Sequence, residues 1–106
     1  MRIFLDDERL PTSDDFEIYR NAEDLVFKIQ KEGIVLDYVS FDHDLGEGIM
    51  TGYDLVKWIV DYELDGNKVL SDKFEYYVHS QNPIGKRNIE TILDNYMKYK
   101  NRPKDR

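Results

Sequence analysis

Short apolar segments alternate with amphipathic helical segments along the chain, and this order limits the folds that are open to it. The apolar runs predict four strands, over residues 2–5, 16–19, 38–41 and 74–78. Apolar residues at helical spacing between and after them predict three helices, the first from Asn21 to Gly33, the second opened by Thr51 and the third opened by Pro83. Strands that alternate with helices of about 10 to 15 residues form parallel β-α units. We therefore expect an α/β fold, a three-layer sandwich with about four parallel strands and helices on both faces.

Length and composition indicate one domain with a short basic end. The chain has 106 residues, which suits a single core, and we assign residues 1–97 to one domain and 98–106 to a basic C-terminal tail. That tail carries five basic groups and one acid; it is either a solvated end or an arm that contacts a polyanion.

Charge and residue usage exclude several classes of protein. The net charge of −7 disfavours stable DNA binding, because phosphate binding relies on a cationic surface. There is no cysteine, which excludes disulfides and thiolate metal sites. No apolar run approaches the roughly 18 residues of a membrane span, and the acidic N-terminal segment is not a signal peptide. We expect a cytoplasmic protein without membrane contact.

Ionisable side chains follow three of the four predicted strands. The carboxyl ends of parallel strands share one edge of the sheet, where ligands of open α/β sheets bind. Carboxylates crowded at that edge repel one another and favour a divalent cation, with Mg²⁺ preferring oxygen ligands and Mn²⁺ or Zn²⁺ also accepting histidine. The side chains that we assign as metal ligands are Asp6, Asp7, Asp42 and Asp44; the alternative is that they are separately solvated loop residues.

Both histidines of the chain fall at strand ends. His43 follows the third strand and His79 follows the fourth, so we expect both at the same edge. Histidine is the side chain most easily used as a general acid or base near neutral pH. The alternative is that each histidine only holds backbone at the end of a strand.

The segment HSQNPIGKRN leads from the fourth strand into the last helix and has the features of an anion site. A helix N-terminus offers free backbone N–H groups and positive potential, and Lys86 and Arg87 add cationic donors there. An exposed Lys-Arg pair without a ligand is the alternative. The residues that we assign to substrate binding are Ser80, Asn82, Lys86, Arg87 and Arg9.

The segments LDDER, SFDHDLG and TGYDL, in this order, resemble a response-regulator receiver domain of flavodoxin-like fold. The resemblance implies that Asp6 and Asp7 match the Mg²⁺-binding acidic pair, Asp42 the phosphoacceptor and Ser80 the hydroxyl residue. The chain departs from receivers in three ways: it has a Pro-containing loop in place of the first helix, it lacks the fifth strand with its lysine, and it carries two additional histidines.

The combination of LDDER, SFDHDLG, TGYDL and HSQNPIGKRNI more closely resembles the cyclic-phosphate-processing receiver domains of bacterial and phage proteins, over residues 2 to about 97. The resemblance implies processing of a cyclic phosphate, such as an RNA 2′,3′-cyclic end or a cyclic nucleotide.

Three functions follow from these residues. The leading one is a phosphoesterase, a phosphoric ester hydrolase in which His43 and His79 act as acid and base, with Asp42 as orienter or ligand of Mg²⁺ or Mn²⁺. The second is a non-catalytic pseudo-receiver that binds a nucleotide or a protein; because the missing fifth strand leaves a sheet edge uncovered, a homodimer is one such partner. The third is phosphorelay through Asp42.

Overall fold

A computed structural model describes residues 1–42, 50–79 and 82–101. Its elements in chain order are β1 (Arg2–Leu5), β2 (Glu17–Tyr19), α1 (Ala22–Glu32), β3 (Leu36–Phe41), α2 (Gly52–Leu64), β4 (Leu70–Val78) and α3 (Pro83–Lys100). All the predicted elements are present. Two strands begin earlier than predicted, β3 by two residues and β4 by four.

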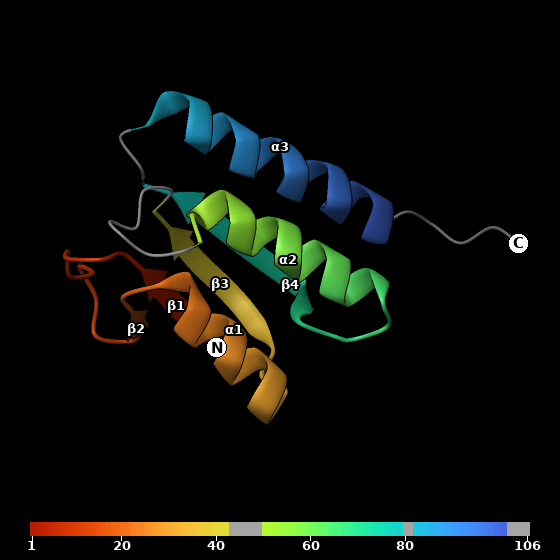
Figure 1. Cartoon of the computed structure of the whole chain (residues 1–106), viewed down its shortest axis with the longest axis horizontal. Coiled ribbons are helices and arrows are strands. Elements are labelled where there is room, and N and C mark those ends of the chain that lie inside the picture. The colour runs from red at the N-terminus through yellow and green to blue at the C-terminus, as the bar shows by residue number, and fades with distance from the viewer. Residues whose placement is uncertain (43–49, 80–81, 102–106) are drawn as a thin grey trace, which may run out of the picture.

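The four strands form one parallel sheet in the order β2-β1-β3-β4 (Figure 1). Leu5 at the end of β1 is in register with Phe41 of β3, which is in register with Val78 of β4. The residues that follow these three strands therefore meet at the same edge of the sheet, as the sequence predicts.

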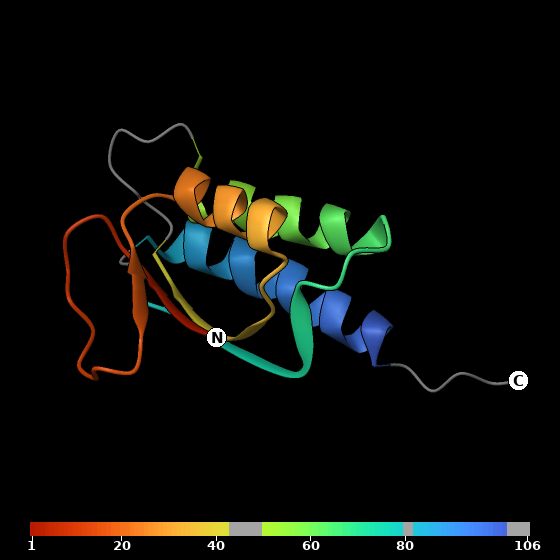
Figure 2. The ribbon, with the colours of Figure 1, turned by 90° about the horizontal axis from the view of Figure 1, so that it is seen from below.

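The predicted α/β fold with four parallel strands is confirmed, but its layers differ from the expected three-layer sandwich. All three described helices lie on one face of the sheet (Figure 2). The connections from β2 to β3 and from β3 to β4 cross the sheet in the same direction, so right-handed crossovers put α1 and α2 on the same side. The connection from β1 to β2 runs the other way, and residues 6–16 form no helix to cover the second face.

The core lies between the sheet and the three helices. The strand residues that face the helices are almost completely buried, including Ile3, Leu5, Val39 and Phe41. Each helix adds an apolar stripe to the same cluster: Leu25 and Ile29 from α1, Leu55 and Ile59 from α2, and Ile89 and Leu93 from α3. Burial of such side chains contributes about 1.5–3 kcal/mol each, so this face holds the helices in place.

The helix boundaries follow from local hydrogen bonds that the sequence predicts. The Asn21 side chain accepts from the backbone N–H of Asp24 and begins α1, which ends at Gly33 with φ 64°. Thr51 and Asp54 form a reciprocal capping box that begins α2. These caps fix where α1 and α2 begin.

The last helix is longer than predicted. Residues 98–100, which the sequence assigns to the basic tail, form the last turn of α3. The Lys100 ammonium there donates to the buried Glu63 carboxylate at 3.1 Å and to the Leu70 carbonyl at 2.6 Å. None of the described helices is both long enough and apolar enough to cross a membrane.

Candidate functional site at the carboxyl edge of the sheet

Asp6 is the first residue after β1, and its side chain is completely buried. Its Oδ1 accepts hydrogen bonds from the backbone N–H groups of Glu8 and Arg9, both at 2.9 Å. Arg20 also holds this turn, because its Nη1 donates to the carbonyls of Asp6 and Arg9. The turn after β1 therefore fixes the Asp6 carboxylate in one orientation.

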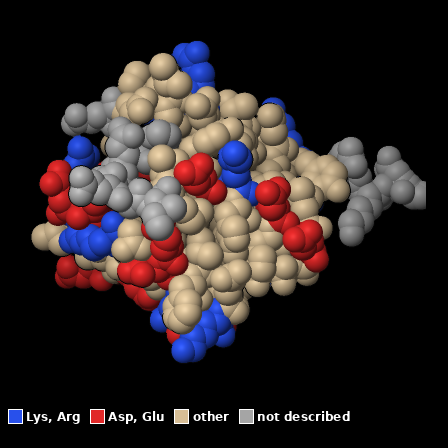
Figure 3. All heavy atoms as spheres, in the orientation of Figure 1, with Lys and Arg blue, Asp and Glu red and all other residues tan. Residues whose placement is uncertain are grey.

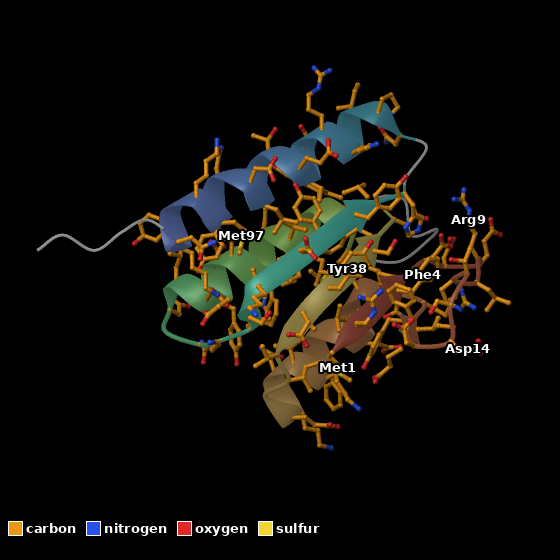
Figure 4. All side chains as sticks on the ribbon, turned by 180° about the vertical axis from the view of Figure 1, so that it is seen from behind. Met1, Phe4, Arg9, Asp14, Tyr38 and Met97 are labelled. Atoms are coloured by element: carbon orange, nitrogen blue, oxygen red, sulfur yellow. The ribbon has the colours of Figure 1, made fainter. Side chains whose placement is uncertain are left out.

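His79 is the first residue after β4 and lies on the sheet face that no described helix covers. Its backbone N–H donates to the Phe41 carbonyl at 2.9 Å, which continues the β3–β4 pairing by one residue. Its imidazole stacks on the Phe4 ring with the two planes parallel and the centroids 4.9 Å apart. Figure 4 looks at this face and shows Phe4 and Tyr38 on their strands with no helix in front of them.

Both ring nitrogens of His79 have partners from neighbouring strands. Nε2 lies 2.8 Å from Oδ2 of Asp6, and Nδ1 lies 2.8 Å from Oγ of Ser40. The His79 side chain is 12% exposed and that of Asp6 is 1% exposed, so water screens their interaction weakly. Asp6 directly after β1, Ser40 near the end of β3 and His79 directly after β4 thus form a hydrogen-bonded chain, Asp6–His79–Ser40.

The protonation of this chain follows from the environment of Asp6. Burial raises the pKa of the Asp6 carboxyl, but hydrogen bonds from the backbone of Arg9 and Glu8 and from the His79 ring outweigh burial and hold that pKa below its ordinary value. Asp6 is therefore ionised at neutral pH and only accepts hydrogen bonds. The 2.8 Å contact of His79 Nε2 with this carboxylate therefore requires a proton on Nε2.

Two of the predicted metal ligands lie together with His79. One ligand atom each from Asp6, Asp42 and His79 lie within 4.8 Å of one another, and Asp42 is 9% exposed. This set of two carboxylates and one imidazole fits a divalent cation of the Mn²⁺ or Zn²⁺ type, and Mg²⁺ through the carboxylates. Asp7 is exposed and lies outside this group.

Four of the predicted substrate-binding residues lie in the described part of the chain, and they differ in exposure and in their contacts. Asn82 is the N-cap of α3, and its Oδ1 accepts from the backbone N–H of Gly85 at 3.0 Å. Lys86 lies in the first turn of α3 with its Nζ 5.9 Å from the centroid of the Tyr77 ring, and Arg87 is exposed. Arg9 is exposed beside Asp6, with Nε 3.9 Å from Oδ2.

Arg9 beside Asp6 and Lys86 beside Tyr77 therefore stand at the rim of the site, whereas the buried Asp6 and Asp42 form its base. In the space-filling view, acidic and basic side chains lie close together at the end of the molecule that holds β1 and β2 (Figure 3).

Three further predictions, His43 as acid or base, Asp44 as ligand and Ser80 as substrate contact, fall outside the described residues. Whether His43 faces His79 stays a prediction.

Sequence reasoning missed three residues that hold the site together. Ser40 and Phe4 were assigned only to strands, and Arg20 received no role. Ser40 had a usable signal, because side chains two apart on a strand share a face, and this places Ser40 with Asp42. Phe4 and Arg20 act through contacts across strands that adjacent residues in the sequence do not reveal.

Comparisons with known proteins place the chain in a family. Residues 1–95 match the family described as the cyclic-phosphate processing receiver domain. No curated protein and no solved structure gave a significant match. Because the match covers most of the chain, this protein belongs to the cyclic-phosphate processing receiver domain family.

Proposed function

We propose that this protein is a phosphoesterase that opens a cyclic phosphate, on an RNA end or on a small cyclic nucleotide. The observation that carries the proposal is the Asp6–His79–Ser40 chain at the carboxyl edge of the sheet, in a member of a family associated with cyclic phosphates. We place the reaction in the cytoplasm, as the sequence suggests.

Opening a cyclic phosphodiester by water requires two proton transfers. The oxygen of water forms a bond to phosphorus while one ring P–O bond breaks, so a base takes a proton from water and an acid gives one to the departing oxygen. We assign these roles to His43 and His79 as a pair, without choosing between them. The Asp6 carboxylate orients the His79 ring through its hydrogen bond with Nε2.

In this proposal the His79 nitrogen that exchanges a proton is Nδ1, because Nε2 is committed to Asp6. Substrate must therefore take over the position of the Ser40 hydroxyl at Nδ1, or exchange the proton through that hydroxyl. Lys86, Arg87 and Arg9 at the rim neutralise the phosphate.

A divalent cation would be held by Asp6 and Asp42, with His79 as a third ligand. When bound, such an ion supplies Lewis acidity toward the phosphoryl oxygens. The chain itself provides the remaining contributions, which are the orientation of His79 and the cationic rim.

One observation favours a second candidate function, binding of a nucleotide or protein without turnover. Both ring nitrogens of His79 already have protein partners, as expected of a histidine that supports structure. A catalytic histidine must give up one of these hydrogen bonds, whereas a binding module keeps both.

The test is hydrolysis of 2′,3′-cyclic nucleotides by the wild type, His43→Ala and His79→Ala, each with Mg²⁺, with Mn²⁺ and with chelator. We expect each single substitution to lower kcat by about 10²-fold or more, the contribution typical of a general acid or base. Tyr99→Leu, on the exposed end of α3, serves as the matched control.

Equal rates for the three proteins would end the catalytic proposal. Saturable binding by the wild type without product formation would support the second candidate instead.

A further inference from the structure

An exposed tyrosine stands beside the site on the sheet face that no described helix covers. Tyr77 is 55% exposed and precedes His79 by two residues on β4, so both side chains project from the same face. It is in register with Ser40, the partner of His79 Nδ1. Its ring therefore lies next to the Asp6–His79–Ser40 chain, on the outer strand of the sheet.

The neighbouring tyrosine shows that packing does not explain Tyr77. Tyr76 points to the helix side, where its hydroxyl donates to the Asp94 carboxylate of α3 at 2.5 Å. Tyr77 has no such place in the core, and more than half of its surface is open to solvent. An exposed ring on an open sheet face is the arrangement by which many proteins stack nucleobases.

A cation accompanies the ring. Lys86 reaches back from the first turn of α3 and places its Nζ 5.9 Å from the Tyr77 centroid. The ammonium therefore accompanies the ring on β4, two residues before His79. The aromatic ring suits the base of a nucleotide, and the cation beside it suits the phosphate.

We propose that Tyr77 is the stacking platform for the nucleobase of the substrate, and that Lys86 pairs with the phosphate of the same nucleotide. The substrate class is then a cyclic phosphate carried on a nucleoside, rather than on a sugar or polyol without a base. Side chains two apart on a strand are separated by about 6.5–7 Å, so a base on Tyr77 brings its own ribose phosphate to His79. The position of the phosphate rests on the proposed function, whereas the stacking of the base does not.

The experiment measures equilibrium binding of adenosine 3′-monophosphate, which is not turned over, by NMR titration. Wild type is compared with Tyr77→Leu, which removes the ring but keeps an apolar side chain, and with Tyr77→Phe, which keeps the ring. Tyr99→Leu is the matched control, because Tyr99 is 57% exposed at the far end of α3. A methyl riboside 3-phosphate serves as the ligand without a base.

We expect Tyr77→Leu to weaken adenosine 3′-monophosphate binding about ten-fold, within the range for removal of a base-stacking ring. Tyr77→Phe and Tyr99→Leu should bind like wild type, and the base-free phosphate should bind all four proteins equally. Unchanged binding by Tyr77→Leu, an equal loss for the base-free ligand, or no nucleotide binding by wild type would each overturn the proposal.

Hydrolysis assays separate this inference from the proposed function. Nucleotide binding that depends on Tyr77, without hydrolysis, would retain the stacking site and remove the phosphoesterase. Hydrolysis with the same KM in wild type and Tyr77→Leu would retain the phosphoesterase and remove the stacking site. Parallel assays with free adenosine 2′,3′-cyclic phosphate and with an oligonucleotide that ends in one identify which source of the nucleotide is preferred.

Discussion

Replacement of Asp6 by asparagine should reverse the tautomer of His79. The Asp6 carboxylate accepts from the backbone N–H groups of Glu8 and Arg9 through Oδ1 and from His79 Nε2 through Oδ2. In Asp6→Asn the amide oxygen can keep both backbone hydrogen bonds, but the amide NH₂ then faces the Nε2 proton. Two donors cannot share this 2.8 Å contact, so the proton should move to Nδ1, where Ser40 can accept it.

The magnitude follows from the bond that is lost. A hydrogen bond to a charged group contributes about 1.5–3 kcal/mol, and the neutral bond gained in the other tautomer returns about 1 kcal/mol of this. We therefore expect Asp6→Asn to lower the free energy of unfolding by about 0.5–2 kcal/mol. Asp6→Ala removes all three acceptor contacts and should cost about 3 kcal/mol or more.

Long-range ¹H–¹⁵N spectra of the imidazoles measure the tautomer directly. The chain has two histidines, so a His43→Gln background assigns the signals of His79. Wild type should carry the proton on Nε2 at neutral pH and Asp6→Asn on Nδ1. A wild-type His79 with its proton on Nδ1, or the same tautomer in both proteins, would refute the reasoning.

The same pair predicts how stability depends on pH. Because the folded pKa of Asp6 lies below the value of 3.8 taken for the unfolded chain, its contribution is fully present above that value and is lost as pH falls through the folded pKa. The free energy of unfolding, measured with urea, should therefore fall more steeply from about pH 5 to pH 2 for wild type than for Asp6→Asn. Asp14→Asn, in the exposed part of the same loop, is the matched control and should keep the wild-type slope.

Substitutions at three further positions test the scaffold by urea denaturation. Glu63→Ala should lower the free energy of unfolding by about 3–5 kcal/mol. It removes a carboxylate that is 4% exposed, and so leaves the Lys100 ammonium and two backbone N–H groups without this acceptor; a change near zero would contradict this role. Gly33→Ala should cost about 1–2 kcal/mol for conformational reasons alone, since φ is 64° and nothing lies within 4 Å of an added Cβ; an unchanged stability would show that the turn relaxes. Asn82→Ala should cost about 1 kcal/mol through loss of the α3 cap, and Asn82→Ser should restore most of it.

Much of the fold was predictable because its signals are local. The caps Asn21 and Thr51 and the left-handed Gly33 act within one helical turn, and the apolar stripes of the helices repeat at helical spacing. The number of helical layers was not predictable from the same signals. It depends on the order of the strands in the sheet, and strand order is a long-range property that no single segment encodes.

The site shows the same division. The sequence alone places Asp6, Asp42 and His79 at strand ends, and in a parallel sheet strand ends share an edge, so their meeting follows from topology. Tertiary structure decides which atoms meet.

The contact of His79 Nε2 with Asp6 and of Nδ1 with Ser40 depends on the β1–β3–β4 register, and the open face that exposes Tyr77 depends on the missing helix after β1. The two His79 hydrogen bonds join residues 39 and 73 positions apart, so their geometry is set only when the strands pair.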